Sequence, residues 1–150
     1  MTLQEAANAL ESLKTETTKK YEIKVYEKFL HILAEMKIRQ FSSDEIQALE
    51  TELEHLDLKS NPENRKKHFK KALSKFETYL RETFLLIPKA YYQKLYGSLG
   101  LSFGLLFGVA ILSNLERSLA ISLGLLGGMV VGLILGCSKD SKAKTEGRVY

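Results

Sequence analysis

The sequence predicts an all-α protein, in which a cytosolic bundle of three to four helices over residues 1–88 precedes a transmembrane hairpin of two helices. The first observation behind this prediction is the distribution of charge along the 150 residues. Two stretches of 19 residues, 95–113 and 119–137, contain no Asp, Glu, Lys, Arg or His. The second is that apolar residues before position 88 recur every three or four residues, without the long alternation that predicts a strand.

The N-terminal part predicts three helices, each marked by a capping signal or an apolar stripe. Thr2-Leu3-Gln4-Glu5 has the form of a capping box and begins the first helix. The Thr-rich stretch from Thr15 to Lys20 weakens that helix, and a second is expected from about Tyr21 to Gln40. Ser42-Ser43-Asp44-Glu45 repeats the capping box and begins a third, shorter helix. The stripes expected to face the core are Leu3, Ala6, Leu10 and Leu13, then Val25, Phe29, Ile32, Leu33 and Met36, then Ile46, Leu49, Leu53 and Leu56.

A fourth helix is expected to begin at Asn61-Pro62, which supplies a cap and a first-turn proline, and to run to about Ile87. Pro88 ends it, because a proline ring disfavours helical conformation at the preceding residue. A bundle of fewer than 90 residues has a modest core, so its apolar faces close either on themselves or on another copy of the chain. The inward stripe of this helix is expected to be Phe69, Leu73, Phe76, Leu80 and Phe84.

Each charge-free stretch is long enough to cross a bilayer. A helix of 19 residues rises about 28 Å, close to the ~30 Å thickness of the hydrocarbon layer. The polar link from Asn114 to Ser118 suits a tight connection between two such helices. The alternative is a hairpin buried in a soluble protein, but the N-terminal part offers too little surface to cover two helices that are apolar all round.

Basic residues flank the hairpin on one side of the expected membrane. The linker over residues 89–94 and the basic tail over residues 138–150 carry six basic side chains, whereas the link between the spans carries only Arg117. Both termini are therefore expected in the cytosol, with the hairpin in the inner membrane and no cleaved signal peptide. Residues 1–88 contain 15 basic and 15 acidic side chains, so the net charge of +4 reflects topology rather than nucleic-acid binding. Tyr91, Tyr92 and Tyr96 fit the aromatic belt of a membrane interface.

Small residues recur at every fourth position along both apolar stretches. In lipid no hydrophobic gain presses two helices together, so small residues are needed to let their backbones approach. We therefore expect them to pack helices, within the hairpin and between copies in a homo-oligomer. The alternative is that glycine is simply common in membrane helices. The predicted helix-packing residues are Gly100, Gly104, Gly108, Ala120, Gly124, Gly128, Gly132 and Gly136, and Gly127 widens the small face of the second helix.

This pattern over residues 95–137 resembles small two-span glycine-zipper membrane proteins of bacteria. The resemblance implies a packing device rather than a defined activity. Some proteins of this kind form pores or assemblies that respond to stress, and the resemblance extends that expectation to this chain.

No motif in the sequence predicts catalysis, a cofactor or a metal site. A di-iron bundle needs two Glu-x-x-His motifs, and only Glu52 and His55 form one. The single Cys137 excludes an internal disulfide. No Gly-rich loop ends in Gly-Lys-Ser/Thr, so nucleotide binding through such a loop is not expected.

The densest basic run surrounds His68 and allows two interpretations. It either contacts anionic lipid headgroups, at about 1 kcal/mol per basic residue, or is a solvated helix face paired with acidic residues between Ser43 and Asp57. The neutral charge of residues 1–88 favours the second. RNA binding is not expected, because aromatic residues beside the run face inward. The residues concerned are Arg65, Lys66, Lys67, Lys70 and Lys71.

The sequence thus predicts a non-enzymatic integral membrane protein that self-associates through its hairpin. It would act as an oligomeric scaffold or as a channel or pore, with a cytosolic helical domain that senses or recruits a protein partner. The alternative is a membrane-disrupting effector, of the toxin or antiviral defence type, held inactive by its cytosolic domain.

Overall fold

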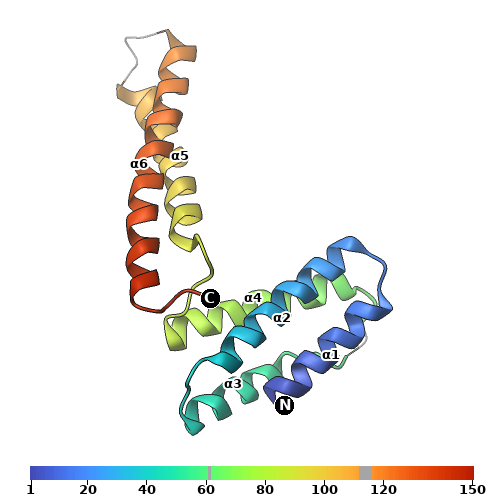
Figure 1. Cartoon of the computed structure of the whole chain (residues 1–150). Helices are drawn as coiled ribbons and strands as arrows, with labels where there is room; N and C mark the ends of the chain where they lie inside the picture. Colours follow the sequence, from blue (N-terminus) through green and yellow to red (C-terminus); the bar gives the residue numbers. More distant parts are fainter. Residues whose placement is uncertain (61, 112–115) are drawn as a thin grey trace. The chain divides into compact units, whose positions relative to one another are not determined.

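The computed structural model describes residues 1–60, 62–111 and 116–150 and confirms the predicted all-α fold class. Within these ranges the chain forms six helices and no strand. It divides into two compact units, Met1–Leu85 and Leu86–Tyr150. The first corresponds to the predicted bundle and the second contains the predicted hairpin (Figure 1).

The first two helices begin and end close to the predicted positions. Helix α1 spans Leu3–Glu16, and the Thr2 side chain accepts a hydrogen bond from the Glu5 amide in the predicted capping box. Helix α2 spans Lys20–Ile38. All five residues of its predicted stripe are buried, as are three of the four predicted in α1, where Leu13 is half-buried.

The next two helices correct one of the predicted boundaries. Helix α3 spans Ser43–His55, with the predicted capping box at Ser42. Helix α4 spans Arg65–Phe84, so Pro62 precedes it and is not in its first turn. The observed N-cap is Asn64, whose side chain accepts a hydrogen bond from the Lys67 amide at 3.1 Å. The cap predicted at Asn61 lies outside the described residues.

The first unit is a four-helix bundle in which α2 packs against both α1 and α4, and α1 also contacts α3 (Figure 1). Aromatic pairs join α2 to α4: the rings of Tyr26 and Phe69 lie 5.1 Å apart, and those of Phe29 and Phe76 lie 5.4 Å apart. Such pairs add to the free energy gained by burying apolar surface. Of the remaining predicted core residues, Ile46 is exposed and Phe84 half-buried.

Helix α4 ends before Pro88, which corrects the predicted end at about Ile87. Leu85 adopts the left-handed conformation with φ 57°, and its amide donates to the Leu80 carbonyl. The chain therefore leaves the helix three residues before the proline. Leu86 and Ile87 are buried in the second unit instead.

The second unit is an antiparallel pair of helices, α5 over Tyr91–Ile111 and α6 over Arg117–Thr145, which lie side by side in Figure 1. Helix α6 continues through the first half of the segment predicted as a basic tail. The last residues then fold back: the Ile87 amide donates to the Arg148 carbonyl at 2.9 Å, and the Tyr150 amide donates to the Ile87 carbonyl at 3.1 Å. The predicted link from Asn114 to Ser118 is described only from Glu116 onward.

Candidate functional site

The predicted small residues lie where α5 and α6 meet. Gly100 faces Gly128, and Gly104 faces Gly124, so that backbone approaches backbone without an intervening side chain. The same register holds at every fourth residue along both helices. The remaining layers of this interface pair Tyr96 with Gly132, Gly108 with Ala120, and Gln93 with Gly136.

A methyl group on any of the glycines in these layers would overlap the opposite backbone. A Cβ built on Gly128 would lie 2.7 Å from the Cα and 2.9 Å from the amide nitrogen of Gly104, inside van der Waals contact. A Cβ on Gly136 would lie 2.6 Å from the Cα of Gln93. Neither neighbour can rotate away, because both are backbone atoms. The interface therefore requires glycine at these places.

Gly127 differs from the other glycines of α6. A Cβ built on it would meet no atom within 4 Å. It lines an apolar groove of about 550 Å³ on one face of the hairpin, together with Leu99, Phe103 and Phe107 of α5 and Val131 of α6. Five glycines of the α5–α6 interface also line this groove, which therefore runs along the seam between the two helices: Gly100, Gly104, Gly124, Gly128 and Gly132.

The large apolar side chains of the hairpin point outward. Only 17% of the most apolar 18-residue window of α5 and 22% of that of α6 are buried, and both helices are long and apolar enough to cross a membrane. Phe103 is 57% exposed, Leu106 65% and Leu126 62%. The buried residues along α5 and α6 are instead mostly glycine and alanine. The two helices of the hairpin thus pack through their backbone at small residues, and the outer surface of the hairpin is apolar.

A carboxylate that the sequence analysis did not single out joins α6 to α5 at the base of the hairpin. Asp140 is 9% exposed, and its Oδ1 and Oδ2 accept hydrogen bonds from the amides of Tyr92 and Gln93 at 2.9 and 3.0 Å. These amides belong to the first turn of α5, where no carbonyl of the same helix is available. A side chain of α6 therefore caps the N-terminus of α5, and its negative charge also complements the helix dipole.

Cationic and aromatic side chains surround this cap. The Lys139 ammonium lies 5.8 Å from the ring centroid of Tyr92 and 5.5 Å from that of Tyr96. The Arg148 guanidinium donates to the Glu146 carboxylate, and this bond together with a contact to Tyr92 raises the pKa of Arg148. The basic segments before α5 and at the end of α6 thus lie at one end of the hairpin.

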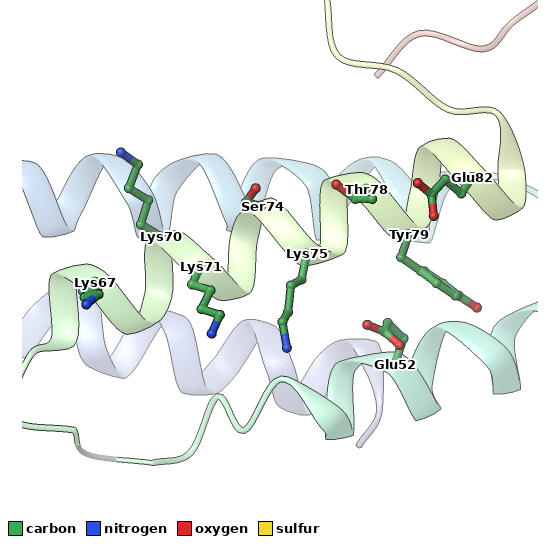
Figure 2. Close-up of a pocket in the computed structure, with 9 residues that line it drawn as sticks. All are labelled: Glu52, Lys67, Lys70, Lys71, Ser74, Lys75, Thr78, Tyr79 and Glu82. Atoms are coloured by element: carbon green, nitrogen blue, oxygen red, sulfur yellow. The ribbon is translucent and has the colours of Figure 1, made fainter.

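The basic run on α4 borders a second hollow, a groove of about 720 Å³ shown in Figure 2. Two rows of side chains at intervals of four residues line it. One row is Lys67, Lys71, Lys75 and Tyr79, and the other is Lys70, Ser74, Thr78 and Glu82. Glu52 approaches from α3, at the end of the groove where Tyr79 lies (Figure 2). Burial, and secondarily the Glu52 charge, raises the pKa of Tyr79.

The expected pairing of this run with acidic residues of α3 is not found among the described residues. Arg65 pairs with Glu16 of α1 at 3.6 Å, and Lys66 lies 4.3 Å from the ring centroid of Tyr21 on α2. Within the described chain, the lysines at 67, 70, 71 and 75 make no ion pair. All four line the groove, so the neutral total charge of the bundle does not imply local neutralisation.

The remaining candidate residues do not converge on a catalytic or metal site within the described chain. His55 lies 3.9 Å from its neighbour Glu52 and is exposed, and no cluster of three or more potential metal ligands occurs in residues 1–60, 62–111 and 116–150. Cys137 is exposed at the end of the apolar part of α6. Comparison of the chain with known protein families, with curated proteins and with solved structures finds no match.

Proposed function

We propose that this protein is a non-enzymatic integral membrane protein whose α5–α6 hairpin spans the bilayer and assembles copies of the chain. The observation that carries the proposal is the exposure of large apolar side chains along two helices of membrane-spanning length. In water these surfaces would form an apolar patch far larger than soluble monomers expose. In lipid the same surfaces need no protein cover.

The ends of the hairpin support an orientation with both termini in the cytosol, in an inner membrane. Lys89 and Lys94 lie beside the start of α5, and Lys139, Lys142 and Lys144 lie on the last turns of α6. Because the helices are antiparallel, these cations occupy the same end, which the positive-inside rule places in the cytosol. Tyr92 and Tyr96 beside Lys139 are suited to the headgroup layer.

Self-association would use the groove that contains Gly127. Five glycines of the α5–α6 interface line the same groove, and beside them a Cβ on Gly127 would meet no atom within 4 Å, which leaves space for a helix of a second copy. Close approach there would gain van der Waals contact that lipid chains supply less well. The small face of α6, which Gly127 widens, would then meet α5 on one side and a second copy of the chain on the other.

The assembly would act as a scaffold or as a hydrophobic, gated pore, with the α1–α4 bundle as its cytosolic sensing or recruitment domain. Few hydroxyl groups in the hairpin are available to line a wet pore. Ser98 donates to the Leu95 carbonyl at 2.9 Å, and Ser102 donates to the Ser98 carbonyl at 3.1 Å, so both bond to their own helix. A continuous polar path of the kind that marks ion conduction therefore lacks support.

The proposal is tested by the mass of the full-length chain purified in mild detergent. A membrane pellet that resists alkaline extraction, and a mass of two or more copies, are expected. Gly127→Leu should lower that mass, because a bulky side chain would occupy the open groove from a position where a Cβ meets no atom of α5. Val130→Leu, at an exposed position outside the groove, serves as the control. A monomer in wild-type protein would contradict self-association, and recovery in the supernatant without detergent would contradict membrane insertion.

A further inference from the structure

The groove beside the basic run of α4 is lined by four lysines and two glutamates. Lys67, Lys71 and Lys75 stand at intervals of one helical turn, and Figure 2 shows Lys71 and Lys75 extending from α4 toward the same side. Like charges four residues apart on a helix repel one another. The ammonium groups of Lys67, Lys71 and Lys75 therefore repel one another, and no carboxylate among the described residues forms an ion pair with them.

Several other basic residues of the bundle pair with carboxylates. Lys14 lies 3.6 Å from Glu27, Lys19 lies 3.4 Å from Glu22, and Lys28 lies 2.5 Å from Glu77. Carboxylates near the groove also have basic neighbours of their own. Glu82 lies 4.0 Å from Arg81, and Glu52 lies 3.9 Å from His55. The positive charge of the lysine row is thus left for a ligand from outside the chain.

We propose that this groove binds a ligand carrying two or more phosphate groups, held by Lys67, Lys71 and Lys75. Lysine ammonium groups bind phosphate as point charges, and the row extends about 12 Å along the helix axis. A single phosphate meets two lysines at most, whereas a chain of phosphates meets all three. Ser74 and Thr78 of the second row also line the groove, but Figure 2 shows their hydroxyl groups on the other side of α4 from Lys71 and Lys75.

The acidic end of the groove sets the position of the ligand. Glu52 and Glu82 lie with Tyr79 at the far end from Lys67, so a polyanion is repelled there and drawn toward the lysines (Figure 2). Two sources supply this chemistry: a free polyphosphate or the diphosphate headgroup of a membrane lipid such as cardiolipin. Such a ligand would be what the α1–α4 bundle senses, and only this sensing role rests on the function proposed above.

Binding is measured by titration calorimetry on the full-length chain in phosphatidylcholine nanodiscs. The soluble probes are orthophosphate, pyrophosphate and tripolyphosphate. In the lipid arm the nanodiscs contain cardiolipin, and competition with tripolyphosphate shows whether a headgroup already occupies the groove. We expect tighter binding of pyrophosphate and tripolyphosphate than of orthophosphate. A lipid source predicts weakened tripolyphosphate binding in cardiolipin nanodiscs, and a soluble source predicts unchanged binding.

The test variant and its control each replace two lysines with glutamine, so the two variants have the same net charge as each other. Lys71→Gln with Lys75→Gln should weaken tripolyphosphate binding by roughly 30-fold, at about 1 kcal/mol per lysine. The control, Lys20→Gln with Lys59→Gln, removes two exposed lysines outside the groove and should retain wild-type affinity. Equal weakening in both pairs, absence of binding by every probe, or equal affinity for a polyglutamate peptide would each overturn the proposal. None of these results depends on whether the hairpin self-associates, so failure here leaves the proposed assembly standing.

Discussion

The carboxylate of Asp140 on α6 accepts a hydrogen bond from the backbone amide of Tyr92 on α5, with 2.9 Å between Oδ1 and nitrogen. Its second oxygen accepts from the amide of Gln93 at 3.0 Å. Helix N-termini are usually capped by a residue just before the helix. Here the cap is 48 residues away in sequence and fastens one helix of the hairpin to the other.

Asp140→Ala should therefore loosen the base of the hairpin. The substitution leaves two amides without their acceptor, at a cost of about 1–3 kcal/mol when these groups stay buried. The measurement is hydrogen–deuterium exchange of the full chain in detergent micelles, where the amides of Tyr92 and Gln93 should exchange faster. Amides near Gly104, three turns further along α5, should exchange as in wild type.

Asp140→Asn separates charge from hydrogen bonding at the same site. An amide oxygen replaces one acceptor and keeps the shape of the side chain, so intermediate exchange is expected. Wild-type exchange in the alanine variant would show that water caps α5 equally well and that Asp140 does not join the helices.

The two neighbouring glycines of α6 give a matched test of the hairpin interface. Gly128→Ala should separate α5 from α6, because its Cβ meets the Gly104 backbone at 2.7 Å. Gly127→Ala should leave the pair intact, since its Cβ meets nothing within 4 Å. Both gain the same helix propensity, ~1 kcal/mol, so the comparison isolates the contact.

The measurement is a disulfide cross-link between cysteines placed on α5 and α6 in a background where Cys137 is replaced by serine. Cross-linking efficiency should fall in Gly128→Ala and remain at the reference level in Gly127→Ala. Equal efficiency in both would mean that the helices do not touch through their smallest residues.

Much of the fold follows from sequence periodicity, because local rules decide it. The capping boxes at Thr2 and Ser42 form as predicted, and the stripe from Val25 to Met36 is buried throughout. The four-residue spacing of glycines also marks the residues that meet in the hairpin. Each of these features depends on neighbours within about one helical turn.

Other features depend on distant contacts that no local pattern contains. Helix α4 ends at Phe84, followed by Leu85 in a left-handed conformation, whereas the prediction based on Pro88 places the end of the helix at about Ile87. Asp140 was missed because it follows the apolar stretch, yet it continues the four-residue series of Gly132 and Gly136. Extending that series by one step would have found it. The unpaired state of Lys71 likewise depends on which elements pack beside α4, and composition gives only the total charge.

The hydroxyl of Tyr26 offers a test of the bundle core. It is buried, and it has no hydrogen-bond partner among the described residues. Burial raises the pKa of this phenol, which stays protonated. Tyr26→Phe removes the unsatisfied group while retaining the ring against Phe69, so we expect the bundle to become more stable by about 1 kcal/mol.

Urea unfolding of the full chain in micelles, followed by circular dichroism, checks this expectation. Tyr79→Phe is the contrasting variant, because the Tyr79 hydroxyl is not among the buried groups without a hydrogen-bond partner, and its loss should not stabilise the bundle. A destabilised Tyr26→Phe variant would indicate that an ordered water satisfies the hydroxyl.

The turn between α1 and α2 predicts a loss of stability in acid. Thr17 donates to the Glu22 carboxylate at 2.8 Å, and this bond, followed by those from Lys19, holds the pKa of Glu22 below its ordinary value of 4.5 against the opposing effect of burial. Because the pKa of Glu22 is lower in the folded than in the unfolded state, its ionised carboxylate stabilises the bundle at pH values above the unfolded-state pKa. That contribution disappears as the pH falls through the folded-state value.

Thr17→Val removes the largest cause of the shift and should reduce the difference in unfolding midpoint between about pH 7 and about pH 3. Thr18→Val is the control, since Thr18 is exposed and bonds neither to Glu22 nor to Lys19 in the described structure. Both variants lose one hydroxyl and gain the same methyl group, so their helix propensities and sizes match. The same pH difference in Thr17→Val as in wild type would mean that the basic neighbours of Glu22 keep it ionised without Thr17: the Lys19 ammonium, 3.4 Å away, and the charge of Arg65.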